Sequence, residues 1–241
     1  MANLLRLVAC LFVVVVSSSS HAALYDRGNG LIYDDVLNIT WMQDANYAQT
    51  SGYAAANASG FFNYGYSNIQ ADGGMGWDAA NTWAAQLEYG GFDSWGLPSA
   101  QLMDATNPCD ANDGSCDAGF NNVTGELAHM FYTNLGNAAG DSILNNVSFT
   151  DAALGGGIET FSNVQGYTYW LSDQYEPKDG DAWAFGGSQG YQGSSNKDRS
   201  YYSWAVHDGD IGAAVIPIPT TAWLFGSALA GLLVAKRKNK K

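Results

Sequence analysis

The residues with the clearest capacity for chemistry lie in one short acidic stretch of the chain. Asp110, Asn112, Asp113 and Asp117 place carboxylate and amide oxygens close together in sequence, and Gly114 allows a tight turn among them. Calcium takes about six to eight oxygen ligands and is often held by such Asp- and Asn-rich loops. The stretch therefore predicts a calcium site, although it lacks the full spacing and the terminal Glu of an EF-hand. A solvated acidic turn is the alternative interpretation.

Two cysteines flank most of this stretch. Six residues separate Cys109 from Cys116, and no other Cys or His lies near them to complete a metal site. The third cysteine, Cys10, belongs to an N-terminal segment that we expect to be removed on export. An isolated close pair in an exported protein predicts a disulfide across a single loop.

A second set of candidates could bind sugar. The run from Glu176 to Asp179 resembles the Glu-Pro-Asn motif with which C-type lectins hold sugar and calcium, with Lys178 in place of the Asn. Aromatic side chains in the strand-like C-terminal part could stack on sugar rings, although most aromatic residues in strands belong to the core. We expect only one or two of them to be exposed. The ligand-binding candidates are Glu176, Asp179, Trp183, Tyr191 and Trp204.

Signals for catalysis are few. His129 lies on a predicted helix without the second His of a His-Glu-x-x-His metal site. His207 precedes Asp208, but the sequence singles out no Ser or Cys as their nucleophile. Carboxylates are too numerous for any pair to be assigned as the dyad of a glycosidase. We therefore expect a protein that binds rather than an enzyme.

The charge of the central region limits its partners. All 23 acidic residues but only four of the ten basic ones lie between Leu24 and Ile216, which gives this region a net charge of −19. Such a field repels nucleic acid and other polyanions and attracts cations, so we expect no nucleic-acid partner. Solubility, for instance in a salty habitat, is the alternative meaning of the charge. About 190 residues suffice for one domain with a hydrophobic core.

The two ends of the chain predict export and membrane anchoring. Residues 1–23 combine a basic start, an apolar stretch and a small-residue site, which is typical of a cleaved secretory signal peptide. Residues 222–235 form an uncharged apolar run that predicts a transmembrane helix, with Trp223 at one interface. A buried C-terminal helix of a soluble domain is the alternative. Basic residues after the run favour the cytoplasmic side, so everything before Pro217 is expected outside. These orienting residues are Lys236, Arg237 and Lys238.

The candidates need a scaffold, and the local patterns predict a loop-rich α+β domain over residues 24–212. Residues 30–42 predict a β-hairpin, and residues 51–74 predict a long irregular loop. Helical spacing or capping predicts helices over residues 77–89, 99–103 and 126–135. The strongest strand patterns cover residues 167–171, 181–185 and 201–206. Early helices followed by antiparallel strands indicate the α+β class.

Several blocks of this domain resemble the DUF1566 family, which is also named for the C-terminal domain of the Legionella collagen-like adhesin. The opening block is Leu31–Tyr47. Later blocks follow in the family's order and are Trp77–Ala80, Gly91–Ser99, Tyr169–Ser172 and Trp204–Val206. The resemblance covers nearly all of the domain. It implies a compact fold related to C-type-lectin-like and formylglycine-generating-enzyme-like domains, and a role in adhesion to sugars or polyanions.

Two departures from that family bear on the ligand. Gly96 stands where the family usually has Arg before Leu-Pro, and His207 stands where it usually has Arg after Ala-Val. Both cations would be partners for carboxylate or sulfate groups. Their loss, together with the charge of −19 on the central region, argues against acidic or sulfated glycans as ligands.

The tail over residues 213–241 is similar to the PEP-CTERM sorting signal in a Pro-x-Pro variant. Pro217, Ile218, Pro219 and Trp223 carry the likeness, with Ile218 in place of the Glu of the namesake motif. The resemblance implies recognition by an exosortase-type membrane protease and anchoring in the inner membrane before processing. It also implies delivery to the envelope or extracellular matrix of a Gram-negative bacterium. Without the resemblance, the same residues predict a plain single-pass anchor.

Together these patterns predict an exported, exosortase-sorted protein of the cell envelope or biofilm matrix with a lectin-like adhesion domain. Its ligand would be a matrix polysaccharide or another glycan, and calcium is the one candidate cofactor. Two alternatives stay open. One is a structural matrix protein that binds only copies of itself, and the other is an enzyme that acts on matrix glycans.

Overall fold

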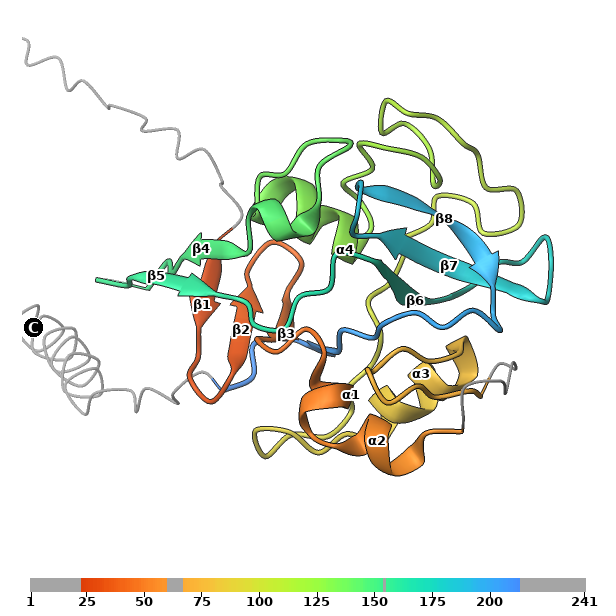
Figure 1. Cartoon of the computed structure of the whole chain (residues 1–241). Helices are drawn as coiled ribbons and strands as arrows, with labels where there is room; N and C mark the ends of the chain where they lie inside the picture. Colours follow the sequence, from red (N-terminus) through yellow and green to blue (C-terminus); the bar gives the residue numbers. More distant parts are fainter. Residues whose placement is uncertain (1–22, 60–66, 154, 213–241) are drawn as a thin grey trace, which may run out of the picture.

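The computed structural model describes residues 23–59, 67–153 and 155–212. This part of the chain is α+β, with mostly short strands and few helices (Figure 1). The predicted sorting tail over residues 213–241, with its transmembrane helix, lies outside the described residues. So does all but the last residue of the predicted signal peptide, and both stay predictions. Within the described ranges, no helix is long and apolar enough to cross a membrane.

The N-terminal hairpin belongs to a four-stranded sheet in the order β1-β2-β3-β9. Its strands are β1 (Leu24–Asp26), β2 (Leu31–Asp34), β3 (Ile39–Met42) and β9 (Val206–Asp208). β2 and β3 confirm the predicted hairpin, with Ile32 opposite Trp41. At its turn the Asp34 carboxylate accepts hydrogen bonds from the amides of Val36 and Leu37, at 3.0 and 3.1 Å. Strand β9 pairs with β3, so the start and the end of the described region close on one sheet.

A three-stranded antiparallel sheet carries most of the aromatic candidates. Its strands are β6 (Thr168–Gln174), β7 (Asp181–Gly186) and β8 (Tyr191–Asn196), in that order. β6 and β7 confirm two of the predicted strands. The pattern over residues 201–206 is a strand only at its end, because Tyr201 and Tyr202 make single bridges to Met75 and Tyr169. A two-stranded sheet is formed by β4 (Ser148–Thr150) and β5 (Ile158–Thr160).

The helices are short. They are α1 (Tyr47–Thr50), α2 (Tyr53–Asn57), α3 (Trp77–Ala85), α4 (Glu126–His129), a π-helical turn η1 (Met130–Asn134) and a 3-10 turn η2 (Ile143–Asn145). α3 confirms the first part of the helix predicted over residues 77–89, and it buries Ala80, Trp83 and Ala84. α4 and η1 together confirm the helical segment predicted over residues 126–135. The stretch over residues 51–74 is not wholly irregular, since it contains α2.

The helix predicted over residues 99–103 is wrong. The chain is irregular there, and Gln101 adopts a positive φ of 52°. Its amides are held by carboxylates from distant parts of the chain: the Ser99 amide donates to Glu126 at 2.8 Å and the Ala100 amide donates to Asp173 at 2.7 Å. A charged acceptor makes a stronger hydrogen bond than a neutral carbonyl. These long-range contacts therefore override the local capping signal.

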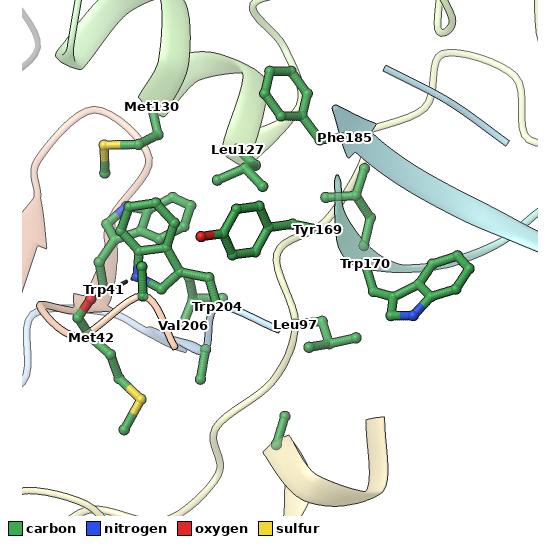
Figure 2. Close-up of a cluster of buried hydrophobic side chains, with 14 of the residues drawn as sticks. Trp41, Met42, Leu97, Leu127, Met130, Tyr169, Trp170, Phe185, Trp204 and Val206 are labelled. Carbon is green, nitrogen blue, oxygen red and sulfur yellow. Dashed lines mark hydrogen bonds between the residues drawn. The ribbon is translucent and has the colours of Figure 1, made fainter. Parts of the chain in front are cut away.

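One hydrophobic core joins the two larger sheets (Figure 2). The Trp204 ring packs in this core, with its centroid 5.2 Å from that of Trp41 and 5.0 Å from that of Phe161. Its indole N–H donates to the Met42 carbonyl at 2.7 Å. Tyr169 from β6 lies 5.9 Å from the same indole. Trp204 is fully buried and lines no described pocket, and its role as a ligand-binding residue stays a prediction.

Candidate functional site

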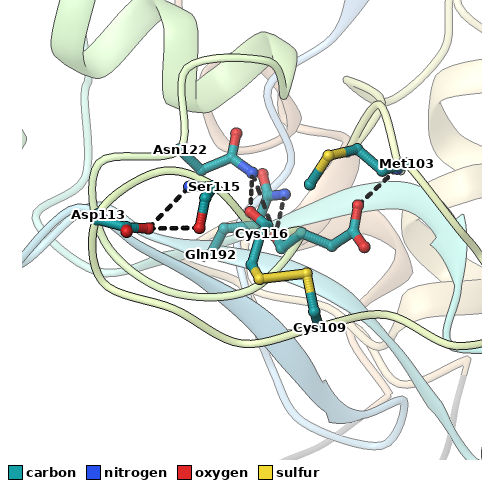
Figure 3. Close-up of a disulfide and its surroundings, with 8 residues drawn as sticks. Met103, Cys109, Asp113, Ser115, Cys116, Asn122 and Gln192 are labelled. Carbon is teal, nitrogen blue, oxygen red and sulfur yellow. Dashed lines mark hydrogen bonds between the residues drawn. A yellow bond between two sulfur atoms is a disulfide. The ribbon is translucent and has the colours of Figure 1, made fainter.

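The disulfide loop forms the first part of the site. Cys109 and Cys116 make the predicted disulfide, with their Cα atoms 5.1 Å apart (Figure 3). Inside the loop the Asp113 carboxylate accepts hydrogen bonds from the Ser115 hydroxyl at 2.6 Å and from the Ser115 amide at 3.0 Å. The hydroxyl, and then the amide, lowers the pKa of Asp113. The loop is thus closed by a covalent bond and by its own turn.

The chain that follows the disulfide docks on the outer edge of β8. Gly119 and Gln192 exchange two backbone hydrogen bonds, at 2.9 and 3.0 Å. The buried Gln192 side chain donates to the Asp117 carbonyl at 2.8 Å. Asn122 donates to the Cys116 carbonyl at 2.9 Å (Figure 3). These contacts hold the loop against the three-stranded sheet.

The four oxygen-bearing residues of the predicted calcium site have separate roles. Asp117 is only 2% exposed and its carboxylate accepts a backbone amide at 2.6 Å. Asp110 accepts a hydrogen bond from the Tyr191 hydroxyl at 3.4 Å, and Asp113 bonds to Ser115 inside the loop. Asn112 accepts the amide of Phe120, which lies beyond the disulfide, at 3.4 Å. In the part of the chain that the structure describes, no group of three or more His, Cys, Asp or Glu side chains is arranged to hold a metal ion. The calcium site stays a prediction.

A pocket of 180 Å³ opens between the disulfide loop and the β7–β8 pair. Its lining residues come from separate stretches of the chain and are Pro108, Cys109, Asp110, Ala118, Tyr175, Trp183, Tyr191, Gly193 and Ser194. The pocket brings together Asp110, Trp183 and Tyr191, which the sequence predicts as independent candidates. We call it the disulfide-loop pocket.

Three aromatic side chains form the apolar part of this pocket. Trp183 on β7 is fully buried, and its only polar side-chain atom, Nε1, has no hydrogen-bond partner among the described residues. The Tyr175 ring packs edge-on against Trp183, with the two centroids 5.5 Å apart. Tyr191 packs edge-on against Phe120 at 5.2 Å. Packing therefore holds these rings in place around the pocket.

The polar part of the pocket consists of oxygen atoms on its rim. The exposed Asp110 carboxylate accepts the hydrogen bond of the Tyr191 hydroxyl. Burial raises the pKa of Tyr191 and the Asp110 charge raises it further, so the phenol stays protonated and able to donate. Ser194 lies opposite Trp183 in the β7–β8 pair and adds an exposed hydroxyl. The described lining contains no Lys, Arg or His, so the pocket suits a neutral hydroxylated ligand better than an anion.

Glu176 and Asp179 lie in the turn between β6 and β7 and are exposed. Neither lines the disulfide-loop pocket, although Glu176 directly follows the lining residue Tyr175. Lys178 places its Nζ 2.8 Å from both carboxylate oxygens of Asp181, so it is engaged within the turn. Sequence reasoning misses Tyr175, whose only signal is its position directly before Glu176.

The two histidines considered for catalysis lie in different surroundings. His129 is buried on α4, and its Nε2 has no partner within the described ranges. His207 packs edge-on against Trp95 at 5.5 Å, and its Nδ1 lies 2.6 Å from the Asp208 carbonyl oxygen. Neither of these contacts pairs a His with a nucleophilic hydroxyl or thiol.

Comparison with protein-family models, with curated proteins and with solved structures finds no match to this chain. The likeness to the DUF1566 family therefore stays a prediction from the sequence blocks.

Proposed function

We propose that this chain is an exported, non-catalytic binding module that recognises a neutral glycan at the disulfide-loop pocket. The observation that carries the proposal is one pocket in which aromatic rings meet carboxylate and hydroxyl oxygens. A sugar ring presents an apolar C–H face and a rim of hydroxyl groups, so it needs both kinds of wall. Trp183 is fully buried, so contacts to a sugar would come from Tyr191, Asp110 and Ser194 around the pocket.

The negative charge of the protein favours a neutral glycan over an acidic one. The region from Leu24 to Ile216 carries a net charge of −19, and the pocket rim itself holds Asp110. An acidic or sulfated glycan would meet repulsion there and no cation in the described lining. Gly96 and His207, in place of the arginines usual in the similar family, act in the same direction. A neutral polysaccharide avoids all of these costs.

The cellular setting is part of the proposal. Disulfides such as Cys109–Cys116 are typical of proteins that work in an oxidising compartment outside the cytoplasm. The signal peptide would direct export of the protein, and an exosortase-type protease at the inner membrane would recognise its Pro-x-Pro tail. The described region would then act as a lectin-like adhesion domain in the envelope or biofilm matrix, with a matrix polysaccharide as its ligand.

A glycan array probed with the purified protein tests the proposal. Neutral glycans are expected to bind, and acidic ones are not. Tyr191→Ala is expected to weaken neutral-glycan binding about two- to tenfold, because one aromatic contact contributes about 0.5–1.5 kcal/mol. Tyr167→Ala is the matched control, since Tyr167 is 54% exposed and lies outside the pocket lining.

Two results would overturn the proposal: an array without any neutral-glycan signal, or equal binding by the Tyr191 and Tyr167 variants. Repeating the array with EDTA addresses the calcium prediction separately. Loss of binding with EDTA would support a calcium site at Asp110 and its neighbours. Unchanged binding would show that the pocket recognises sugar without a metal.

A further inference from the structure

Four stretches of this strongly acidic chain carry no formal charge. They cover residues 142–150, 160–172, 182–196 and 200–206, and none of them contains an Asp, Glu, Lys or Arg. They are separate in sequence, because charged residues stand between each pair. The structure brings parts of all four together on one surface, so an acidic protein gains a face with an uncharged centre.

The four stretches meet beside the first residues of β6. A Cβ on Gly166 would lie 2.8 Å from Leu144 Cδ1, so the Leu144 side chain lies directly against the chain there. The Gly187 amide donates to the Tyr167 carbonyl at 2.8 Å. The Tyr167 ring packs edge-on against Tyr201, with the two centroids 5.8 Å apart. We call the surface formed by Leu144, Tyr167 and Tyr201 the Leu144 patch.

The patch exposes apolar and aromatic side chains to solvent. Leu144 is 53% exposed and Tyr167 is 54% exposed, while Tyr201 is half-buried. Asn145 and Ser188, which adjoin these residues in sequence or through Gly187, are exposed and uncharged. The core of a protein–protein interface is depleted of charged residues and enriched in aromatic ones, Tyr among them. The Leu144 patch has this composition.

Carboxylates lie at the border of the patch. Burial raises the pKa of Tyr202, and the charge of Asp72 and the Tyr167 phenol raise it further, so Asp72 lies close to this side of the patch. Asp72 itself is exposed. Asp141 directly precedes the uncharged stretch that contains Leu144. A molecule that approaches the patch therefore meets an uncharged centre with negative charge at its edge.

We propose that the Leu144 patch is the contact through which two copies of this chain form a dimer. Each copy carries a net charge of −19 between Leu24 and Ile216, so two copies repel each other wherever their carboxylates meet. This repulsion is smallest where two uncharged patches meet. A cationic partner would instead be drawn to the carboxylates outside the patch. In a two-fold dimer the same patch meets itself, so Leu144 packs against the Tyr167 ring of the partner subunit.

The dimer does not depend on the proposed glycan binding, but its consequence for adhesion does. The Leu144 patch shares no residue with the lining of the disulfide-loop pocket, so a dimer presents two pockets to one polysaccharide. Two linked sites raise avidity. On an array, Tyr167→Ala would lose this avidity with its pocket intact. The Tyr167 and Tyr191 variants are therefore also compared by solution titration with a monovalent glycan, which measures single pockets.

Sedimentation equilibrium of the purified full chain, without any glycan, tests the dimer. We expect a reversible monomer–dimer equilibrium in the wild type. Leu144→Asp places like charges opposite each other across the two-fold axis and is expected to raise the dimer Kd by about tenfold or more. Leu144→Met keeps an apolar side chain and is expected to keep the dimer.

Met103→Asp is the matched control for the added charge. Met103 is 59% exposed and follows Ala100, whose amide donates to Asp173 near the end of β6 that lies opposite Tyr167. This variant adds the same charge away from the patch and is expected to dimerise nearly as well as the wild type. Circular dichroism of each variant checks that it is folded.

Salt gives a second, independent measurement. Raising the salt from about 0.1 M to about 1 M shortens the Debye length from about 10 Å to about 3 Å and screens the carboxylates at the border. The dimer is therefore expected to tighten with salt, whereas a dimer held by ion pairs would weaken.

Several results would overturn the proposal. They are a wild type that stays monomeric at every concentration, a dimer that Leu144→Asp leaves intact, a dimer that both Asp variants weaken equally, and a dimer that weakens with salt. Dimer formation through the C-terminal tail would give the second of these results. None of them bears on the disulfide-loop pocket, so the proposed function stands or falls separately on glycan binding.

Discussion

Removing the disulfide measures how far the covalent bond stabilises the fold around the candidate pocket. Replacing both Cys109 and Cys116 with Ser opens a cross-link that spans seven positions in sequence. In the chain-entropy account, closing a loop of this length reduces the freedom of the unfolded chain and stabilises the folded protein by about 2.4 kcal/mol. The double variant is expected to lose about this amount from its free energy of unfolding.

Urea unfolding followed by tryptophan fluorescence is the assay, because Trp41, Trp183 and Trp204 are fully buried and report on the core. With an m-value of about 2–3 kcal/mol/M, the loss corresponds to a fall of about 1 M in the midpoint, at unchanged m. Wild-type protein in reductant is expected to match the double variant. Ser115→Ala is the matched control, since it removes one hydrogen bond to Asp113 in the same loop and leaves the disulfide intact.

A midpoint within about 0.2 M of the wild-type value would refute the reasoning, because about 0.5 kcal/mol or less would then come from the cross-link. A lower m-value would also count against it, since less surface would then be exposed on unfolding, whereas opening a loop in the unfolded chain does not reduce that surface. The backbone pairing of Gly119 with Gln192 does not depend on the disulfide. We therefore expect the folded double variant to keep its loop docked on β8.

Two further predictions concern buried side chains. Trp204→Ala is expected to destabilise the protein by about 3–5 kcal/mol, because it empties a core position and leaves the Met42 carbonyl without its donor. The same urea assay checks this, and a loss below about 1 kcal/mol would argue against a core role. Burial raises the pKa of Glu126, although a hydrogen bond from the Ser99 amide lowers it in part. The folded state therefore binds the Glu126 proton more tightly than the unfolded state does. The contribution of this proton to the free energy of unfolding is full below the unfolded pKa and is lost as the pH rises through the folded pKa. Glu126→Gln should gain stability relative to the wild type across that rise, and parallel pH profiles of the free energy of unfolding would contradict this.

Local sequence signals predict those parts of the fold whose contacts are short-range. The hairpin over residues 31–42 has a turn that its own Asp34 stabilises through the next amides. The start of α3 follows from apolar spacing within one helix, and the disulfide follows from two cysteines close in sequence. The stretch over residues 99–103 shows where local sequence signals fail to predict the structure. The Ser99 hydroxyl does accept the Gln101 amide at 3.0 Å, but the carboxylates of Glu126 and Asp173 accept the Ser99 and Ala100 amides, and no helix forms.

The sequence alone predicts the disulfide loop, from its cysteine pair. It also supplies a list of candidate ligand contacts, from its acidic residues and its aromatic strand residues. The tertiary structure decided which candidates meet. Trp183 and Trp204 both follow strand-like patterns, yet Trp204 donates to Met42 in the core while Trp183 lines a pocket with Asp110 and Tyr191. Both indoles are fully buried, so the difference lies in what surrounds each one, and those surroundings depend on which segments cover the side chain. That covering is set by long-range packing, such as the pairing that docks the disulfide loop on β8, and no local periodicity encodes it.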